Sequence, residues 1–114
     1  MAVKYILRLP EPSRARGAEP SLSFTSDGAG GLAAELQAAL RDDTLFQRWR
    51  ALQEDPDEVD DALGATDPAA TVVGKQEDLM IELHATTSIP SGVLKQRLRW
   101  LAGDHWVLAD VRNP

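Results

Sequence analysis

Glu82 and His84 are neighbouring side chains whose types could carry out acid–base chemistry. They stand two residues apart in a segment whose alternation predicts a strand, so they share one face about 6.6–7 Å apart. A carboxylate beside an imidazole can act as general acid and base, or as two ligands of a metal ion. With Arg8 or Lys4 as an anion clamp, the pair predicts a small enzyme as one alternative. A surface histidine near a carboxylate is the simpler interpretation, and we favour it.

No complete catalytic or metal-binding set accompanies this pair in the sequence. The chain has no cysteine, which excludes thiolate ligands and cysteine nucleophiles, and no Gly-x-Ser-x-Gly motif marks an activated serine. The glycine cluster 28–31 lacks the spacing of a phosphate-binding loop, and the acidic run 55–61 departs from the calcium-loop pattern. We therefore predict no cofactor, no metal and no catalytic residue beyond the weak candidates Glu82 and His84.

Length and charge limit the function classes further. A chain of 114 residues is long enough for a modest core, so we expect a single domain over residues 1–114. The net charge of −6 disfavours a nucleic-acid partner, because binding to a duplex depends on neutralising phosphates. No apolar stretch is long enough for a signal peptide or a membrane span, so we expect a cytoplasmic protein without a membrane partner. Arginine outnumbers lysine and alanine is abundant, which points to a bacterial source.

Seven of the eighteen acidic residues lie in residues 54–70, which we interpret as an acidic connector. Its acidic residues are Glu54, Asp55, Asp57, Glu58, Asp60, Asp61 and Asp67, with no basic residue among them. Such a segment could dock on a positively charged protein. A second alternative function is therefore an acidic inhibitor or immunity-like protein that binds a basic partner.

A small set of strands and helices must position these side chains. Apolar–polar alternation predicts strands over 3–9, 79–86 and 105–111, and a shorter strand over 71–73 followed by a turn over 74–77. Leucine stripes predict one helix that begins at Ser26 or Asp27 and another that ends at Gly103. A capping box from Thr44 to Gln47 predicts a kink or a new helix. Residues 11–20 predict an exposed loop, and 21–25 either an edge strand or an extended lead-in.

The order of these elements is strand, helix, strand, strand, helix, strand. In a chain of this size, that order favours an α+β fold of the ferredoxin-like, split β-α-β type. In this two-layer sandwich, two main helices cover one face of a four-stranded antiparallel sheet, and the first and third strands lie in the middle. The other face of the sheet is then open.

Alternation assigns side chains to the two faces of this sheet. The face under the helices is predicted to carry Val3, Tyr5, Leu7, Leu9, Leu79, Ile81, Leu83, Ala85, Val107, Ala109 and Val111. The open face is predicted to carry Lys4, Ile6, Arg8, Met80, Glu82, His84, Thr86, Trp106, Leu108, Asp110 and Arg112. This open face mixes large apolar side chains with charges of both signs, which is typical of an interface as well as of a solvated surface.

The leading hypothesis is a small non-catalytic binding module that self-associates as a homodimer or docks on a protein partner through the open sheet face. The predicted binding residues are Arg8, Met80, Glu82, His84, Trp106, Leu108 and Asp110. Trp106 favours this hypothesis, because a large exposed aromatic side chain is costly unless a partner covers it.

The second predicted helix offers a weaker candidate surface. Lys95 and Arg99 share one flank, Arg97 lies on the other, and Trp100 is close by. A basic flank beside an aromatic ring could contact phosphate, RNA or an acidic protein. An ordinary exposed helix surface is the simpler interpretation.

Overall fold

The computed structural model of the chain describes residues 2–114 and has an α+β fold with three helices and one antiparallel sheet. The strands are β1 (Val3–Leu9), β2 (Thr71–Glu77), β3 (Met80–Thr87) and β4 (Val107–Arg112), and the helices are α1 (Ala29–Arg41), α2 (Thr44–Ala51) and α3 (Ser91–Ala102). The strand order is β2-β3-β1-β4, so β1 and β3 lie in the middle. The predicted α+β class and the four-stranded antiparallel sheet are confirmed.

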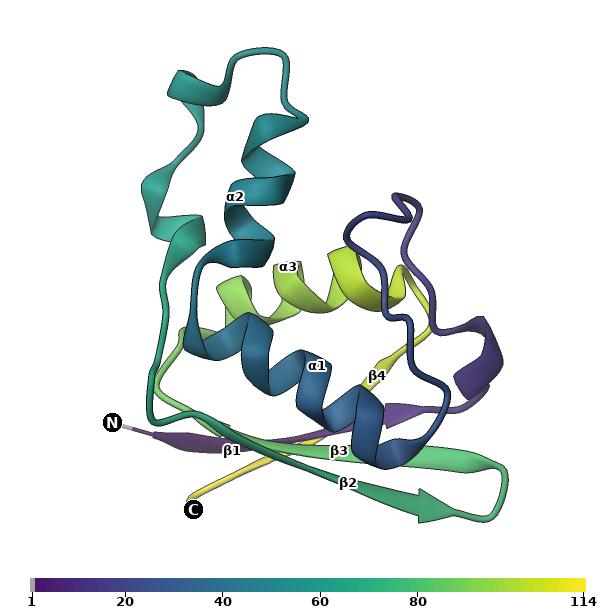
Figure 1. The fold of residues 1–114 in the computed structure, drawn as a ribbon. Helices are drawn as coiled ribbons and strands as arrows, with labels where there is room; N and C mark the ends of the chain where they lie inside the picture. The colour runs from purple at the N-terminus through teal and green to yellow at the C-terminus, as the bar shows by residue number, and fades with distance from the viewer. Residues whose placement is uncertain (1) are drawn as a thin grey trace.

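Helices α1 and α3 lie on the same side of the sheet, as Figure 1 shows, and leave the other side open. Helix α2 and the segment that follows it project beyond this helical layer, away from the strands. The expected pair of covering helices is therefore joined by a third, separate helix. It is the new helix that the pattern after Arg41 indicated, and it packs on α3 rather than on the sheet: the Trp49 and Trp100 rings stack with centroids 4.8 Å apart.

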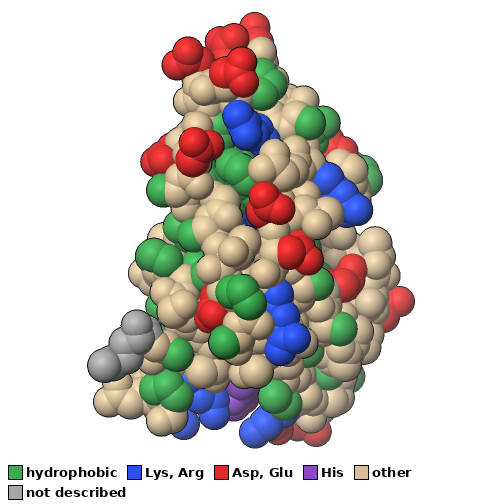
Figure 2. Space-filling view, turned by 60° about the vertical axis from the view of Figure 1, so that its left-hand side comes forward, with side chains coloured by type: hydrophobic (Ala, Val, Ile, Leu, Met, Phe, Trp, Pro, Cys, Tyr) green, Lys and Arg blue, Asp and Glu red, His purple; other side chains and the backbone are tan. Residues whose placement is uncertain are grey.

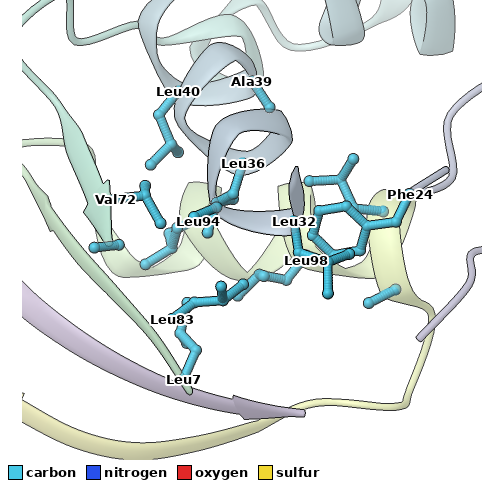
Figure 3. Close-up of a cluster of buried hydrophobic side chains, with 14 of the residues drawn as sticks. Leu7, Phe24, Leu32, Leu36, Ala39, Leu40, Val72, Leu83, Leu94 and Leu98 are labelled. Atoms are coloured by element: carbon cyan, nitrogen blue, oxygen red, sulfur yellow. The ribbon is translucent and has the colours of Figure 1, made fainter. Parts of the chain in front are cut away.

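The core fills the space between the helices and the covered sheet face. Figure 3 shows leucines from α1 and α3 pointing towards Leu7 of β1 and Leu83 of β3. Phe24, which comes from the segment before α1, closes one end of this cluster and is 2% exposed. That segment is a lead-in and not a strand: its amide at Phe24 donates to the carbonyl of Leu101 at 2.9 Å.

Strand β2 continues beyond its predicted end. Residues 74–77, expected as a turn, pair with β3, and the turn is formed by Asp78 and Leu79. Leu79, expected on the covered face, is therefore 88% exposed at the tip of the hairpin. Gly74 suggested a turn but is needed for packing, because a Cβ there would lie 2.2 Å from the carbonyl oxygen of Ala29 in α1.

Both helix starts differ in detail from the predicted caps. Helix α1 begins after Gly28, and neither Ser26 nor Asp27 caps it. Helix α2 begins at the predicted Thr44, but the capping box does not form. Instead, the Asp42 carboxylate accepts from the Thr44 amide at 3.0 Å, and Gln47 donates to the Asp43 side chain at 3.1 Å.

A β-bulge in β4 overturns half of the predicted faces for that strand. Ile6 pairs with Asp110 while Leu7 pairs with Leu108, so Ala109 is the extra residue. An unpaired residue shifts the alternation by one, and side chains before it change face. Trp106 and Leu108 therefore pack against the core, and Val107 lies on the open face, 51% exposed. The assignment of Trp106 and Leu108 to the open face was wrong.

Candidate functional site

The open face of the sheet carries a hydrogen-bonded group of three side chains, Arg8, Glu82 and His84. Register places Arg8 opposite Glu82 on adjacent central strands, and His84 follows two residues along β3. The Arg8 Nε donates to Glu82 Oε2 at 2.9 Å, and His84 Nε2 lies 3.1 Å from Glu82 Oε1. Both oxygens of the Glu82 carboxylate therefore have a partner, and its charge is neutralised within the face.

This group is more enclosed than its place on an open face suggests. The side chains of His84 and Glu82 are 11% and 15% exposed, and Ile6, directly opposite His84, is 5% exposed. The His84 Nδ1 atom is buried without a hydrogen-bond partner, while Nε2 faces the carboxylate. In the neutral ring the carboxylate selects the tautomer with hydrogen on Nε2, which leaves the Nδ1 lone pair unsatisfied.

The surroundings also fix the charge of Glu82. Hydrogen bonding to His84, followed by hydrogen bonding to Arg8, lowers the pKa of the Glu82 carboxyl against the opposing effect of burial. The carboxylate therefore stays ionised at neutral pH. An ionised and fully paired carboxylate is a poor proton donor, so the group is better suited to binding and positioning than to general acid catalysis.

Five of the seven predicted binding residues lie together on the open face. Arg8, Met80, Glu82, His84 and Asp110 project from β1, β3 and β4 on that side. The Asp110 carboxylate accepts from Arg112 Nε at 2.6 Å and from the Val111 amide, and both interactions lower its pKa.

Strand β2 adds residues to this face that the sequence analysis missed. Val73 stands opposite His84, and Lys75 opposite Glu82. Lys75 was missed because residues 74–77 were interpreted as a turn, and Val73 because no faces were assigned to the short strand predicted over 71–73. The alternation of Val73, Lys75 and Glu77 with their neighbours was the available signal.

Exposed large apolar side chains concentrate at the sheet. Within residues 2–114, the exposed large hydrophobic residues are Leu52, Val73, Leu79, Val107 and Val111. All of them except Leu52 belong to a strand or to the β2–β3 turn. The open face thus combines a neutralised polar centre with valines on both edge strands.

The basic flank expected on α3 does not form. Arg97 is 0% exposed and donates to three carbonyl oxygens, those of Ala39, Leu63 and Ala65, at 2.6–2.9 Å. Trp100 is 7% exposed beneath Trp49. Only Lys95 and Arg99 remain accessible, so this helix offers no cluster of cations around an aromatic ring.

Six of the seven acidic residues of the connector are exposed, and Figure 2 shows acidic side chains crowded at the end of the molecule farthest from the sheet. Asp67 is the exception. Its carboxylate accepts from the Ser88 amide and from Thr87 Oγ1, both at 2.9 Å, and from the Ala69 amide. Hydrogen bonding to the Ser88 backbone is the main reason that its pKa is lowered. Asp67 therefore has a structural role.

The hollows found within residues 2–114 lie away from Glu82 and His84. One, of about 380 Å³, runs between the 20–25 segment and helices α1 and α2; another, of about 180 Å³, lies beside Trp106. In the part of the chain that the structure describes, no three histidine or carboxylate side chains are grouped to hold a metal ion. None of its helices, over the same residues, is long and apolar enough to cross a membrane.

Comparison with known proteins identifies no relative. No protein-family model matches the chain, and no curated protein or solved structure matches it. The functional argument therefore depends on the geometry of the open sheet face itself.

Proposed function

We propose that this protein is a small binding module that contacts another protein through the open face of its sheet and performs no catalysis. The observation that carries this proposal is the pairing of exposed Val73 and Val107 on the edge strands with the enclosed Arg8–Glu82–His84 group between them. Interface centres combine apolar contact area with little net charge, and here the charge of Glu82 is already neutralised by Arg8.

Two further features support binding rather than catalysis. The hollows found within residues 2–114 are lined by neither Glu82 nor His84, whereas enzymes hold small substrates in a concave site. The Glu82 carboxylate is also occupied by two internal partners. A substrate would have to displace one of them before it could use this group.

We also propose that the architecture is the ferredoxin-like sandwich. The order of strands and helices along the chain and the central position of β1 and β3 support this assignment, with α2 as an addition between α1 and β2. In such a sandwich the uncovered sheet face is the broad flat surface available to a partner.

A photocrosslinking amino acid placed at position 73 tests the proposal in cells that produce the protein. The matched control is position 52, because Leu52 is as exposed as Val73, at 54% against 56%, but lies just after α2. We expect a covalent protein adduct from position 73 and none from position 52. Absence of any adduct at position 73 would overturn the proposal.

The exposed acids of the connector favour a second candidate, docking on a basic protein. A crosslinker at position 57 separates the two, because Asp57 belongs to the segment after α2. That segment projects away from the strands, as Figure 1 shows. If position 57 alone gives an adduct, and if the yield of that adduct falls steeply as salt is added, the docking surface is the acidic end and not the sheet face.

A further inference from the structure

We infer that the open face binds a second copy of this chain. In this dimer the two sheets stack with their open faces together, and a two-fold axis lies between them, perpendicular to the strands and parallel to the sheets. This inference rests on the proposed function and specifies its partner. It follows from the distribution of charge along the strands, from the pairs that each possible axis creates, and from the size of the face.

The two ends of the open face carry opposite charge. At one end lies the row formed by Thr71, Thr86, Lys4 and Arg112 across the four strands. At the other end lie Glu77 and, in the adjoining turn, Asp78. Within residues 2–114, Lys4, Glu77 and Asp78 take part in no ion pair of 4 Å or less. Each end therefore has charge left over to attract the opposite end of another molecule.

An axis across the strands brings these opposite ends together. It sets each strand over the same strand of the second copy in the reverse direction, so the positive end covers the negative end. An axis along the strands would set the end with Lys4 and Arg112 over the same end of the second copy, and Glu77 and Asp78 would meet no cation. It would also place Arg8 over Glu82, but these two side chains already pair within each copy. A diagonal axis would join opposite ends but place Lys4 over Lys75. Charge complementarity thus selects the axis across the strands.

The centre of the face fits the same arrangement. The midpoint of the axis falls between the row of His84 and the row of Glu82, so His84 faces Glu82 of the second copy. On the β2 edge, Val73 lies over the aliphatic stem of Lys75 and next to Val73 of the second copy. No position in this register sets two like charges opposite each other. Figure 2 shows a histidine flanked by basic side chains at the sheet end of the molecule, at the opposite end from the cluster of acidic side chains.

The size of the face sets the expected strength. Four strands of about seven residues span roughly 19 by 23 Å, or about 450 Å² per copy. That is below the area of about 800 Å² per partner found in standard stable complexes, so the dimer should be a transient one with a micromolar dissociation constant.

Thr71 and Glu77 provide the test, because the inferred axis places them opposite each other. Within one copy they stand six residues apart on β2, about 20 Å, and cannot interact. Thr71→Lys should tighten the dimer about fivefold and Thr71→Glu should weaken it about fivefold, measured by sedimentation equilibrium at low salt. In the Glu77→Lys background this order should invert. Thr71→Gln is the uncharged control and should change the dissociation constant less than twofold.

The outcomes separate this inference from the proposed function. The inference would be overturned if Thr71→Lys still tightened the dimer in the Glu77→Lys background. It would also be overturned if the protein stayed monomeric at about 500 µM, roughly five hundred times a dissociation constant of about 1 µM. If position 73 then still crosslinks to a different protein, the binding module stands with another partner. A dimer that ignores both Thr71 variants and Val73→Asp uses another surface, which would overturn the inference and self-association through this face.

Discussion

Arg97 is a fully buried cation at the centre of helix α3, and its side chain joins three parts of the chain. Its guanidinium donates to Ala39 at the end of α1 and to Leu63 and Ala65 in the connector. Burial lowers its pKa, while the charges of Asp43 and Asp42 act in the opposite direction. Arg97 is therefore one of the side chains that hold the connector to the body, and its loss would remove a donor from three carbonyl groups.

Replacing Arg97 by methionine should destabilise the protein by about 3–5 kcal/mol, because buried carbonyl oxygens lose charged donors. Arg97→Lys should recover little, since an ammonium cannot reproduce the planar fork of donors. The measurement is urea unfolding followed by circular dichroism. Arg99→Met is the matched control on the exposed side of the same helix and should change stability by less than about 0.5 kcal/mol. Equal effects of the two variants would contradict the structural role of Arg97.

The His84–Glu82 contact can be measured at the level of one carboxyl group. His84→Phe removes the largest of the interactions that lower the pKa of Glu82, so this pKa should rise in the variant. Carbon-detected NMR titration of the side-chain carboxyl checks the shift. The pKa of Glu35 should stay constant: although burial raises it, hydrogen bonds from Thr25 and Ser26 lower it, and these are absent from the sheet face. A constant Glu82 pKa would exclude the contact in solution.

At the scale of elements, close packing decides where small residues are required. Gly74 in β2 lies directly under the first turn of α1, where a Cβ would meet the Ala29 carbonyl carbon and oxygen. Gly92 in the first turn of α3 has no atom within 4 Å of the corresponding position. Packing therefore requires a glycine at position 74, whereas at position 92 a larger side chain has room.

Gly74→Ala should destabilise the protein by at least about 2 kcal/mol, because backbone atoms of α1 must move. Gly92→Ala should instead stabilise it by about 0.5–1 kcal/mol, since alanine restricts the unfolded chain and suits a helix. Thermal and urea unfolding of both variants give the two signs. A neutral Gly74→Ala would mean that α1 does not rest on β2 as described.

At the scale of the whole molecule, charge is divided between an acidic end and a sheet end with mixed charge. The acidic end is held in place by Arg97 and by Asp67, whose carboxylate binds the turn between β3 and α3. The connector holds no basic residue. Among residues 2–114, its acidic side chains form one ion pair of 4 Å or less, between Arg50 and Asp57 at 3.7 Å. Acidic repulsion there is tolerated because the side chains are exposed to solvent and screened by salt.

Asp67 should make the stability of the molecule depend on acid pH. Its pKa is lowered in the folded state, so its contribution is complete above the unfolded value near 3.9 and is lost as pH falls through the folded pKa. Asp67→Asn should cost about 1–3 kcal/mol at pH 7. The gap between the two proteins should narrow below about pH 4, as urea unfolding at a series of pH values can show. A gap that stays constant down to pH 2, well below the ordinary aspartate value, would contradict this role.

The sequence by itself determined the helices, the two central strands and most of the open face. Alternation in 3–9 and 79–86 identified β1 and β3 and the faces of Arg8, Glu82 and His84, because one buried side fixes a period of two. Leucine stripes and Gly103, which has a φ of +63°, identified α3 and its end. These signals are local, and a single window of sequence contains all of the information that they need.

Only the tertiary structure decided the rest. The bulge at Ala109 moves Trp106 to the core because β4 must follow β1, and no residue of β4 signals the extra position. Gly74 continues a strand because α1 packs on it, and Arg97 is buried because distant carbonyl groups accept from it. In each case the deciding partner is more than thirty residues away in sequence, and local pattern carries no information about such contacts.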